Sequence, residues 1–174
     1  MRKKRLLQLT AALLCAVILS ACGGAPADAD YTCTVSISCA TILDNMDQCA
    51  ESKKELVPAD GVILPPTEVA FAEGESAFDV LQRVCRDNGI HLESKFTPMY
   101  NSAYIQGIHN IYEFDVGKLS GWMYAVNDWF PNYGCSLYQV QDGDVIRWVY
   151  TCDLGADVGG GQAAGDGQQE GAST

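Results

Sequence analysis

Few side chains in this 174-residue sequence could perform catalysis. His91 and His109 are the only imidazoles, and none of the common serine-hydrolase, zinc-protease or phosphate-loop motifs is present. A cysteine nucleophile needs a neighbouring histidine or a helix N-terminus to lower its pKa. Cys85 instead falls on the apolar face of a predicted helix, where a thiol is inert. The sequence therefore predicts a protein without enzymatic activity.

The eight cysteines are better explained by disulfide bonds than by catalysis or a metal site. No C-x-x-C pair is present, so a zinc site is not predicted. Six cysteines follow residue 30, and an even number in an exported domain favours disulfide bonds. The pairing stays open: Cys135–Cys152 is favoured because both flank the last predicted strand, whereas Cys85 could remain a buried thiol. The six candidates are Cys33, Cys39, Cys49, Cys85, Cys135 and Cys152.

Paired acidic residues could bind a divalent cation. Asp142 and Asp144 flank a glycine, and Asp28 and Asp30 have the same spacing. Either pair offers fewer oxygen ligands than the about six to eight that calcium takes. The D-G-D sequence before a predicted strand is more typical of a turn. No metal ligand is therefore predicted, and metal binding stays a minor alternative.

The first 22 residues have the order of an export signal. A basic stretch from Arg2 to Arg5 precedes an apolar stretch from Leu6 to about Leu19, which is short for a membrane-spanning helix. Leu19-Ser20-Ala21-Cys22 resembles the bacterial lipobox, which implies a signal peptide over residues 1–21 and lipidation of Cys22. Residues 22–30 would form a flexible tether. The predicted location is the outer face of the bacterial cytoplasmic membrane, with a retained spanning segment as the alternative.

The net charge excludes several classes of partner. The formal charge is −11, and removal of residues 1–21 leaves 7 basic and 22 acidic residues, a charge of −15. Such a surface repels the phosphate backbone of nucleic acids and the headgroups of anionic lipids. We therefore expect no nucleic-acid binding, and membrane attachment only through the lipid anchor.

Two segments give clear local predictions. Residues 31–39 alternate between apolar and hydroxyl side chains, as in a half-buried strand. Ser76 followed by Asp79 forms a capping-box pattern at the start of an amphipathic helix over residues 77–88. Gly89 follows as a helix stop. These elements must position the binding residues considered next.

Further short strands are predicted over 67–71, 90–96, 103–107, 121–127 and 145–151. One helix among several strands predicts an α+β fold, with the folded domain over residues 31–154. Residues 155–174 contain many glycines and almost no large apolar side chain, which predicts a disordered tail.

Aromatic residues are densest between residues 120 and 133. In the predicted strand, Trp122 and Tyr124 share one face. Trp129, Phe130 and Tyr133 follow in a loop, where aromatic side chains commonly form a binding surface. The alternative is that Trp129 and Phe130 fold back and cap the core.

Four blocks of sequence resemble the transcobalamin-like C-terminal domain family, similar to the cobalamin-binding β-domain of intrinsic factor and transcobalamin. They are residues 74–81 (GESAFDVL), 104–110 (YIQGIHN), 120–127 (SGWMYAVN) and 142–148 (DGDVIRW). The resemblance implies a β-grasp-like, curved mixed sheet packed on the helix at 77–88. It also implies a ligand site where the second and third blocks approach each other. The candidate ligand-binding residues, with the aromatic loop included, are Ile108, Asn110, Trp122, Tyr124, Asn127, Trp129 and Tyr133.

The leading hypothesis is a lipid-anchored, non-catalytic binding module for cobalamin, another corrinoid or a similar small molecule. No cofactor is required, and cobalamin would be a ligand. One small domain cannot bury a ligand of that size, so a membrane transporter or a second binding subunit is the expected partner. The alternative is a cell-surface module that binds a protein or a glycan, and the second alternative is a divalent-metal-binding protein.

Overall fold

The computed structural model of the protein describes residues 26, 29–99 and 101–160. The predicted signal peptide at 1–21, the predicted lipidation site Cys22 and most of the predicted tether lie outside the described residues, as do residues 161–174. Within the described part of the chain, no helix is long and apolar enough to cross a membrane.

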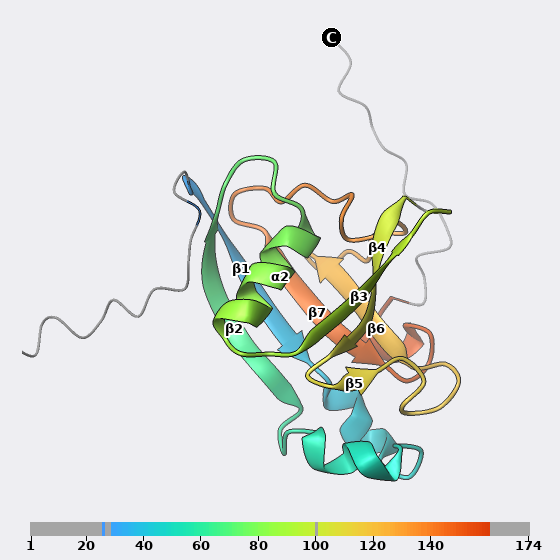
Figure 1. Ribbon diagram of the computed structural model, residues 1–174. Helices are drawn as coiled ribbons and strands as arrows, with labels where there is room; N and C mark the ends of the chain where they lie inside the picture. Colours follow the sequence, from blue (N-terminus) through green and yellow to red (C-terminus); the bar gives the residue numbers. More distant parts are fainter. Residues whose placement is uncertain (1–25, 27–28, 100, 161–174) are drawn as a thin grey trace, which may run out of the picture.

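The main sheet has four strands in the order β2-β1-β7-β6 (Figure 1). β1 pairs in parallel with β7, whereas the β1–β2 and β6–β7 pairs are antiparallel. This mixed sheet confirms the predicted α+β class. The strands are β1 (Tyr31–Ser38), β2 (Val62–Phe71), β6 (Gly121–Val126) and β7 (Val145–Thr151).

The strand β2 lies at one edge of this sheet and begins earlier than predicted. Pro65 and Pro66 lie within it, and an edge strand tolerates proline because one side of its backbone needs no ladder partner. The two prolines therefore fit the edge position of β2. Their ring constraint does not prevent the strand from extending back to Val62.

The predicted amphipathic helix is α2 (Ala77–Asp87). The Ser76 side chain accepts a hydrogen bond from the Asp79 backbone N–H, and the Asp79 side chain accepts one from the Ser76 N–H, so the capping box is complete. The helix ends at Asn88, and Gly89 follows with a φ of 65°. Ala77 and Leu81 of the predicted apolar face are fully buried, and so is Val80, which was not assigned to that face.

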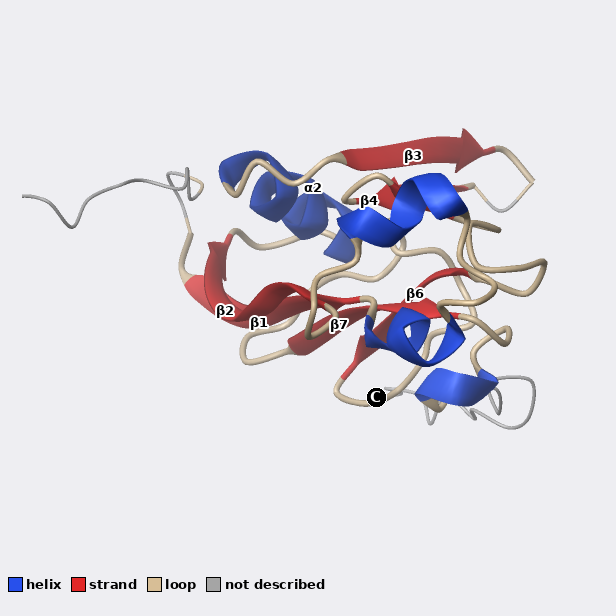
Figure 2. Ribbon diagram, turned by 90° about the horizontal axis from the view of Figure 1, so that it is seen from below, coloured by secondary structure: helices blue, strands red, loops and turns tan. Residues whose placement is uncertain are grey.

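A second sheet has three strands in the order β3-β4-β5. These are β3 (Leu92–Thr97), β4 (Ser102–Ile108) and β5 (Ile111–Tyr112). β3, β4 and α2 lie together as a layer over the main sheet (Figure 2). The predicted strands at 90–96 and 103–107 are confirmed with shifted ends, whereas the short β5 was not predicted.

The region between β1 and β2 contains two 3-10 helices, η1 (Ala40–Asn45) and η2 (Glu51–Leu56). A third, η3 (Ala156–Val158), lies beyond the predicted end of the folded domain at residue 154. The structure therefore differs from the predicted tail boundary at 155, because Val158 packs on a small apolar cluster with Phe130 on the outer face of the main sheet. The many glycines after residue 155 predicted a disordered tail and gave no sign that Val158 packs on the sheet.

All six cysteines of the described residues are free thiols. The favoured Cys135–Cys152 pair is not formed, because the two residues lie in different surroundings. The Cys135 carbonyl accepts a hydrogen bond from the Phe78 N–H at the start of α2. Cys152 follows β7, where its backbone N–H donates to Asp157. Five of the six thiols are instead buried members of the apolar core.

Candidate functional site

Two adjoining pockets lie between the β3–β4 hairpin and the loop that follows β6. The outer pocket has a volume of about 490 Å³ and the inner pocket about 190 Å³. Their linings share Ala103, Tyr104, Pro131 and Gly134, so the two pockets are neighbours. The outer pocket is also lined by Thr97, Ser102, Asn132, Tyr133 and Leu137. The inner pocket is also lined by Ile105, Trp122, Met123, Tyr124, Cys135 and Trp148.

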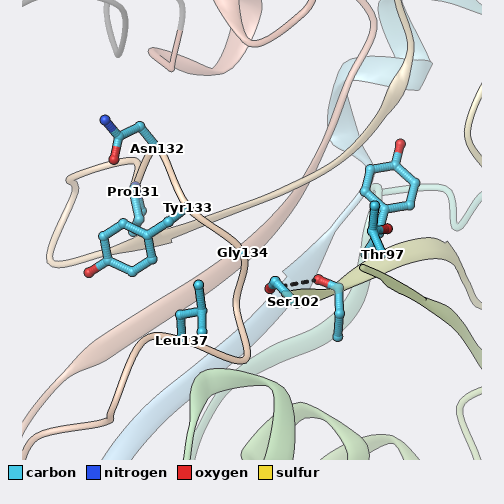
Figure 3. A pocket seen from close by; sticks show the side chains of 9 residues that line it. Thr97, Ser102, Pro131, Asn132, Tyr133, Gly134 and Leu137 are labelled. Carbon is cyan, nitrogen blue, oxygen red and sulfur yellow. Dashed lines mark hydrogen bonds between the residues drawn. The ribbon is translucent and has the colours of Figure 1, made fainter. Parts of the chain in front are cut away.

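Loop 131–137 and the hairpin form opposite walls of the outer pocket. Figure 3 shows Tyr133 and Leu137 on the loop side and Ser102 and Thr97 on the hairpin side. The Ser136 hydroxyl joins the walls: it accepts a hydrogen bond from the Ala103 N–H at 2.9 Å and lies 3.0 Å from the Ser102 hydroxyl. The walls are therefore held together by hydrogen bonds at the base of the pocket.

Gly134 allows the closest approach of the two walls. A Cβ atom at this position would lie 1.7 Å from the Ser102 Oγ and 2.4 Å from its Cβ, far inside van der Waals contact. Only glycine can place the loop backbone this close to β4. The pocket shape therefore depends on the missing side chain of Gly134.

Four aromatic side chains on β6 and β7 lie on the face of the main sheet that the hairpin covers. Trp122 is paired in register with Tyr150, and Tyr124 with Trp148. The Trp122 and Tyr150 rings meet edge to face with centroids 5.3 Å apart, and the Tyr124 and Trp148 rings stack at 5.4 Å. These pairs arise because alternate residues of adjacent antiparallel strands share one face. They provide a rigid aromatic base beneath the inner pocket.

One polar atom of this base has no partner among the described residues. The Trp122 Nε1 donates to the Ile111 carbonyl at 2.8 Å, and the Tyr124 hydroxyl donates to the Tyr133 carbonyl at 3.0 Å. The Trp148 Nε1 is buried and donates to no described atom. An unpaired buried donor costs about 1–3 kcal/mol of folding free energy. Other atoms of Trp148 line the inner pocket, whereas its Nε1 is shielded from solvent.

The pocket linings contain no Asp, Glu, Lys, Arg or His. Their ionisable groups are phenols and one thiol. Burial, together with a hydrogen bond to Glu113, raises the pKa of the Tyr104 hydroxyl to about 12. Burial likewise raises the pKa of the Cys135 thiol to about 12 and raises the pKa of Tyr124. At neutral pH the side chains that line the pockets therefore carry no charge, and the lining suits a molecule with an apolar body.

Three predicted site residues line these pockets and a fourth lies beside them. Trp122 and Tyr124 line the inner pocket, and Tyr133 lines the outer pocket. Trp129 is 48% exposed and meets the Tyr133 ring edge to face, with centroids 5.9 Å apart. Phe130, in contrast, is buried against the outer face of the main sheet, which matches the alternative that it folds back.

The other three predicted residues line neither pocket. Ile108 is fully buried in the core, and Asn110 sits in the turn between β4 and β5, where its carbonyl accepts from the Lys53 Nζ at 2.6 Å. The two family-like blocks do approach each other, because Tyr104 and Ile105 of one block line the inner pocket together with Trp122 of the other, but Ile108 and Asn110 take no part in this lining. Asn127 has a φ of 50° in a turn, where its amide donates to Asp144 and accepts from the Val145 N–H.

Several residues that line the outer pocket were not predicted. Ser102, Tyr104 and Leu137 carry no local signal of binding in the sequence, because a strand tyrosine or a loop leucine is common in any domain. Their roles arise from the contact between β4 and loop 131–137, which joins positions more than 30 residues apart in the sequence. The high density of aromatic residues between 120 and 133 was the sequence feature that pointed to this pocket.

The acidic pair at residues 142 and 144 belongs to a turn. The Asp142 carboxylate accepts a hydrogen bond from the Thr32 N–H at 2.9 Å. Asp144 is buried and accepts from the Asn127 side chain, the Tyr138 hydroxyl and the Gln141 N–H. Within the described ranges, no group of three or more His, Cys, Asp or Glu side chains could hold a metal ion.

Comparison with known proteins gives a family match and a fold likeness. Residues 74–152 match the family described as Domain of unknown function (DUF4430). The crystal structure of haptocorrin in complex with cobinamide (Cbi) is similar over 71% of this chain, with a TM-score of 0.53 and 13% sequence identity. This chain spans 25% of the haptocorrin chain, and the likeness shows a shared fold for that part.

A second structure, of a candidate metal-binding protein from Ruminococcus gnavus ATCC 29149, has a TM-score of 0.41 and 14% sequence identity. The match covers 70% of this chain and 97% of that chain. No curated protein matches the sequence.

Proposed function

We propose that this chain is a non-catalytic, small-molecule-binding module with a transcobalamin-like fold, and that a corrinoid such as cobalamin is its ligand. The observation that carries the proposal is the pair of adjoining pockets. Their volumes, about 490 and 190 Å³, fall in or near the range of about 300–1,000 Å³ typical of ligand sites. Their mainly apolar and aromatic lining also fits such a site.

Two further observations support this proposal. The fold is shared with part of haptocorrin, a protein solved with cobinamide bound. The uncharged lining offers hydroxyl, amide and indole groups around an apolar interior, which suits a large neutral molecule with amide substituents. The same lining provides no acid, base or activated nucleophile, which supports a role without catalysis.

The proposed ligand is larger than the site. A corrinoid would place only one edge or substituent in the pockets, so the rest must be covered by a second binding subunit or a membrane transporter. The proposed lipid anchor at Cys22 would hold the module at the outer face of the cytoplasmic membrane, next to such a partner. The anchor rests on the sequence pattern at residues 1–22.

A second candidate function is favoured by the aromatic and apolar side chains around the outer pocket. Phe96 and Met99, at the hairpin tip, are 59% and 83% exposed. Trp129 and Leu137 are 48% and 47% exposed on the facing loops. Exposed aromatic groups of this kind also suit binding of a protein or a glycan at a cell surface.

Equilibrium dialysis of the full chain against cyanocobalamin and cobinamide separates these candidates. We expect saturable binding of a corrinoid, with a Kd that rises about tenfold in Tyr133→Ala and Leu137→Ala, because each loses apolar contact worth about 1.4 kcal/mol. Phe114→Ala is the matched control, since Phe114 is 62% exposed and lines neither pocket. Absence of binding up to about 1 mM, the weak limit of useful affinity, would contradict the corrinoid proposal.

A further inference from the structure

The strand β3 lies at an open edge of the second sheet. Its neighbour in that sheet is β4, and Figure 2 shows β3 at the outer side of the layer, with β4 nearer to the main sheet. Residues 93–96 are exposed, and Leu92 and Thr97 at the two ends are half-buried. Residues 92–96 line neither pocket, so this edge is a surface separate from the proposed ligand site.

Hydrogen bonds at both ends of the hairpin show which backbone groups of β3 face outward. The Ala103 N–H donates to the Ser136 hydroxyl, so its register partner Phe96 directs its own N–H and C=O away from β4. At the other end, the His109 N–H donates to the His91 carbonyl, so His91 faces β4 and the next residue faces outward. Because this direction alternates along a strand, every second residue presents its backbone at the open edge. These residues are Leu92, Ser94 and Phe96.

The outward backbone groups are available for pairing. In the described part of the chain, none of the backbone hydrogen bonds outside the β3–β4 ladder engages residues 92, 94 or 96. Two other sheet edges are less suited to pairing. β2 contains Pro65 and Pro66, which have no N–H to donate, and at the end of β6 the backbone of Val126 is already bonded to Trp129.

The sequence of β3 is self-complementary about Ser94. We consider two β3 strands paired antiparallel, with a two-fold axis at Ser94. Glu93 of one chain then lies opposite Lys95 of the other, and Leu92 lies opposite Phe96. The same axis aligns the outward backbone groups, because residues 92, 94 and 96 are spaced symmetrically about it. One register therefore satisfies the backbone, the charges and the apolar side chains together.

The charges on this edge favour a second copy of the chain. Among the described residues, Glu93 and Lys95 take part in none of the ion pairs. The Glu93 carboxylate accepts a hydrogen bond from the Tyr112 hydroxyl at 2.8 Å and has further lone pairs for an ammonium group. Charges on an edge strand discourage pairing when like charges meet. In the register about Ser94, opposite charges meet instead.

We propose that β3 is a self-association surface, through which two copies of this chain pair antiparallel about Ser94 and join their three-stranded sheets into one. The contact is confined to one short strand from each copy, and interfaces below about 1,200 Å² are typical of weak, transient complexes. The net charge of −11 on each chain also opposes association. We therefore expect a dimer with a Kd on the order of 100 µM.

Exchange of the two charges tests the register, with sedimentation equilibrium of the full chain as the measurement. Lys95→Glu and Glu93→Lys should each raise the dimer Kd about tenfold or more, because each places like charges opposite one another. An equimolar mixture of the two variants should associate about as well as wild type, since every acid then faces a base. Lys118→Glu is the matched control: Lys118 is exposed and lies outside β3, so the same change of charge should leave the Kd unaltered.

Hydrogen exchange of the wild-type chain, resolved to single amides, tests the register without a substitution. The amides of Leu92, Ser94 and Phe96 should exchange several-fold more slowly at about 1 mM than at about 10 µM protein, because they donate across the two-fold axis. The Glu93 and Lys95 amides face β4 and should show no such dependence. This measurement decides the question if a charge variant fails to fold.

Several outcomes overturn the proposal. A wild-type chain that stays monomeric up to about 1 mM excludes the dimer. A dimer that Lys95→Glu and Glu93→Lys leave intact, or folded variants that do not associate when mixed, places the contact elsewhere. Exchange at residues 92, 94 and 96 that does not depend on concentration has the same meaning. Corrinoid binding is a separate property, so either result leaves the proposed function to its own test.

Discussion

At the scale of single residues, the buried Asp144 carboxylate accepts hydrogen bonds from three donors in the turns that flank β6 and β7. It is 4% exposed and accepts hydrogen bonds from Asn127 at 2.8 Å, Tyr138 at 2.9 Å and the Gln141 N–H at 2.8 Å. These bonds fix the turn before β7 and the turn after β6. A buried carboxylate with three donors is costly to remove, because the donors are left without a partner.

We expect Asp144→Ala to lower the free energy of unfolding by about 2–4 kcal/mol, because the three donors lose their hydrogen-bond acceptor. Asp142→Ala is the matched control: Asp142 is exposed and accepts only from the Thr32 N–H, so a loss below about 1 kcal/mol is expected. Urea denaturation followed by tryptophan fluorescence measures both. Equal losses in the two variants would show that Asp144 is not the centre of this turn.

The buried thiols make a prediction about alkaline pH. Burial raises the pKa values of Cys33, Cys39, Cys85 and Cys135 from about 9 to about 12. Between these values the unfolded chain loses thiol protons that the folded chain retains. The stability from the retained protons is therefore complete below about pH 9 and declines as the pH rises toward about 12.

Cys85→Ala should make this decline shallower, by up to about 1.4 kcal/mol per pH unit, because one titrating group is removed. Val84→Ala, at the adjacent buried position of α2, removes apolar volume without removing a proton and should keep the wild-type slope. Urea denaturation from pH 8 to pH 11 gives the slopes. Parallel curves for wild type and Cys85→Ala would contradict the assignment of the decline to buried thiols.

At the scale of elements, the capping box of Ser76 and Asp79 stabilises the first turn of α2. Besides the two reciprocal backbone bonds, the Ser76 hydroxyl donates to the Asp79 carboxylate at 2.6 Å. We expect Ser76→Ala to cost about 1–2 kcal/mol of stability, since the first turn loses its acceptor. Thermal denaturation checks this, with the exposed Ser94→Ala of β3 as a control that should change little. A wild-type melting temperature for Ser76→Ala would contradict the role of the cap.

The elements were largely predictable because their signals are local. The alternation at residues 31–39 and the Ser76–Asp79 pattern each lie within one element, and both were confirmed. The same reasoning identified the strands that became β6 and β7. It missed β5, because a strand of two residues lacks a full period of side chains.

The site was only partly predictable because it forms between elements. Trp122, Tyr124 and Tyr133 were found through aromatic density, whereas Ser102 and Leu137 became site residues only when β4 met loop 131–137. Asn127 was predicted to bind ligand, yet its amide completes a turn with Asp144. From the sequence alone, an asparagine that hydrogen-bonds to nearby backbone groups in a turn cannot be distinguished from one that binds a ligand.

At the scale of the whole molecule, Gly134 is a point of close approach between loop 131–137 and β4. We expect Gly134→Ala to lower stability by about 1–3 kcal/mol, because a methyl group would overlap Ser102 and force the loop away from β4. The pockets would change shape with it. Gly121→Ala is the matched control, since its nearest neighbour to a new Cβ is at 3.8 Å.

The second change Ser102→Gly removes the overlapping atoms and should restore part of the stability lost in Gly134→Ala. Urea denaturation of the two single variants and the double variant gives the coupling. Additive losses would show that the contact between loop and hairpin does not limit the packing of the layers.

The parallel pairing of β1 with β7 has a consequence for how the chain folds. Thr34 pairs with Val145, so the centre of the sheet joins segments separated by more than 100 residues. Such distant pairings slow folding, because a long loop must close before the contact forms. During synthesis β1 can pair only with β2, and its other edge stays open until the final strand is made. In that interval the open edge can pair with other chains, so we expect folding to be slow and sensitive to protein concentration.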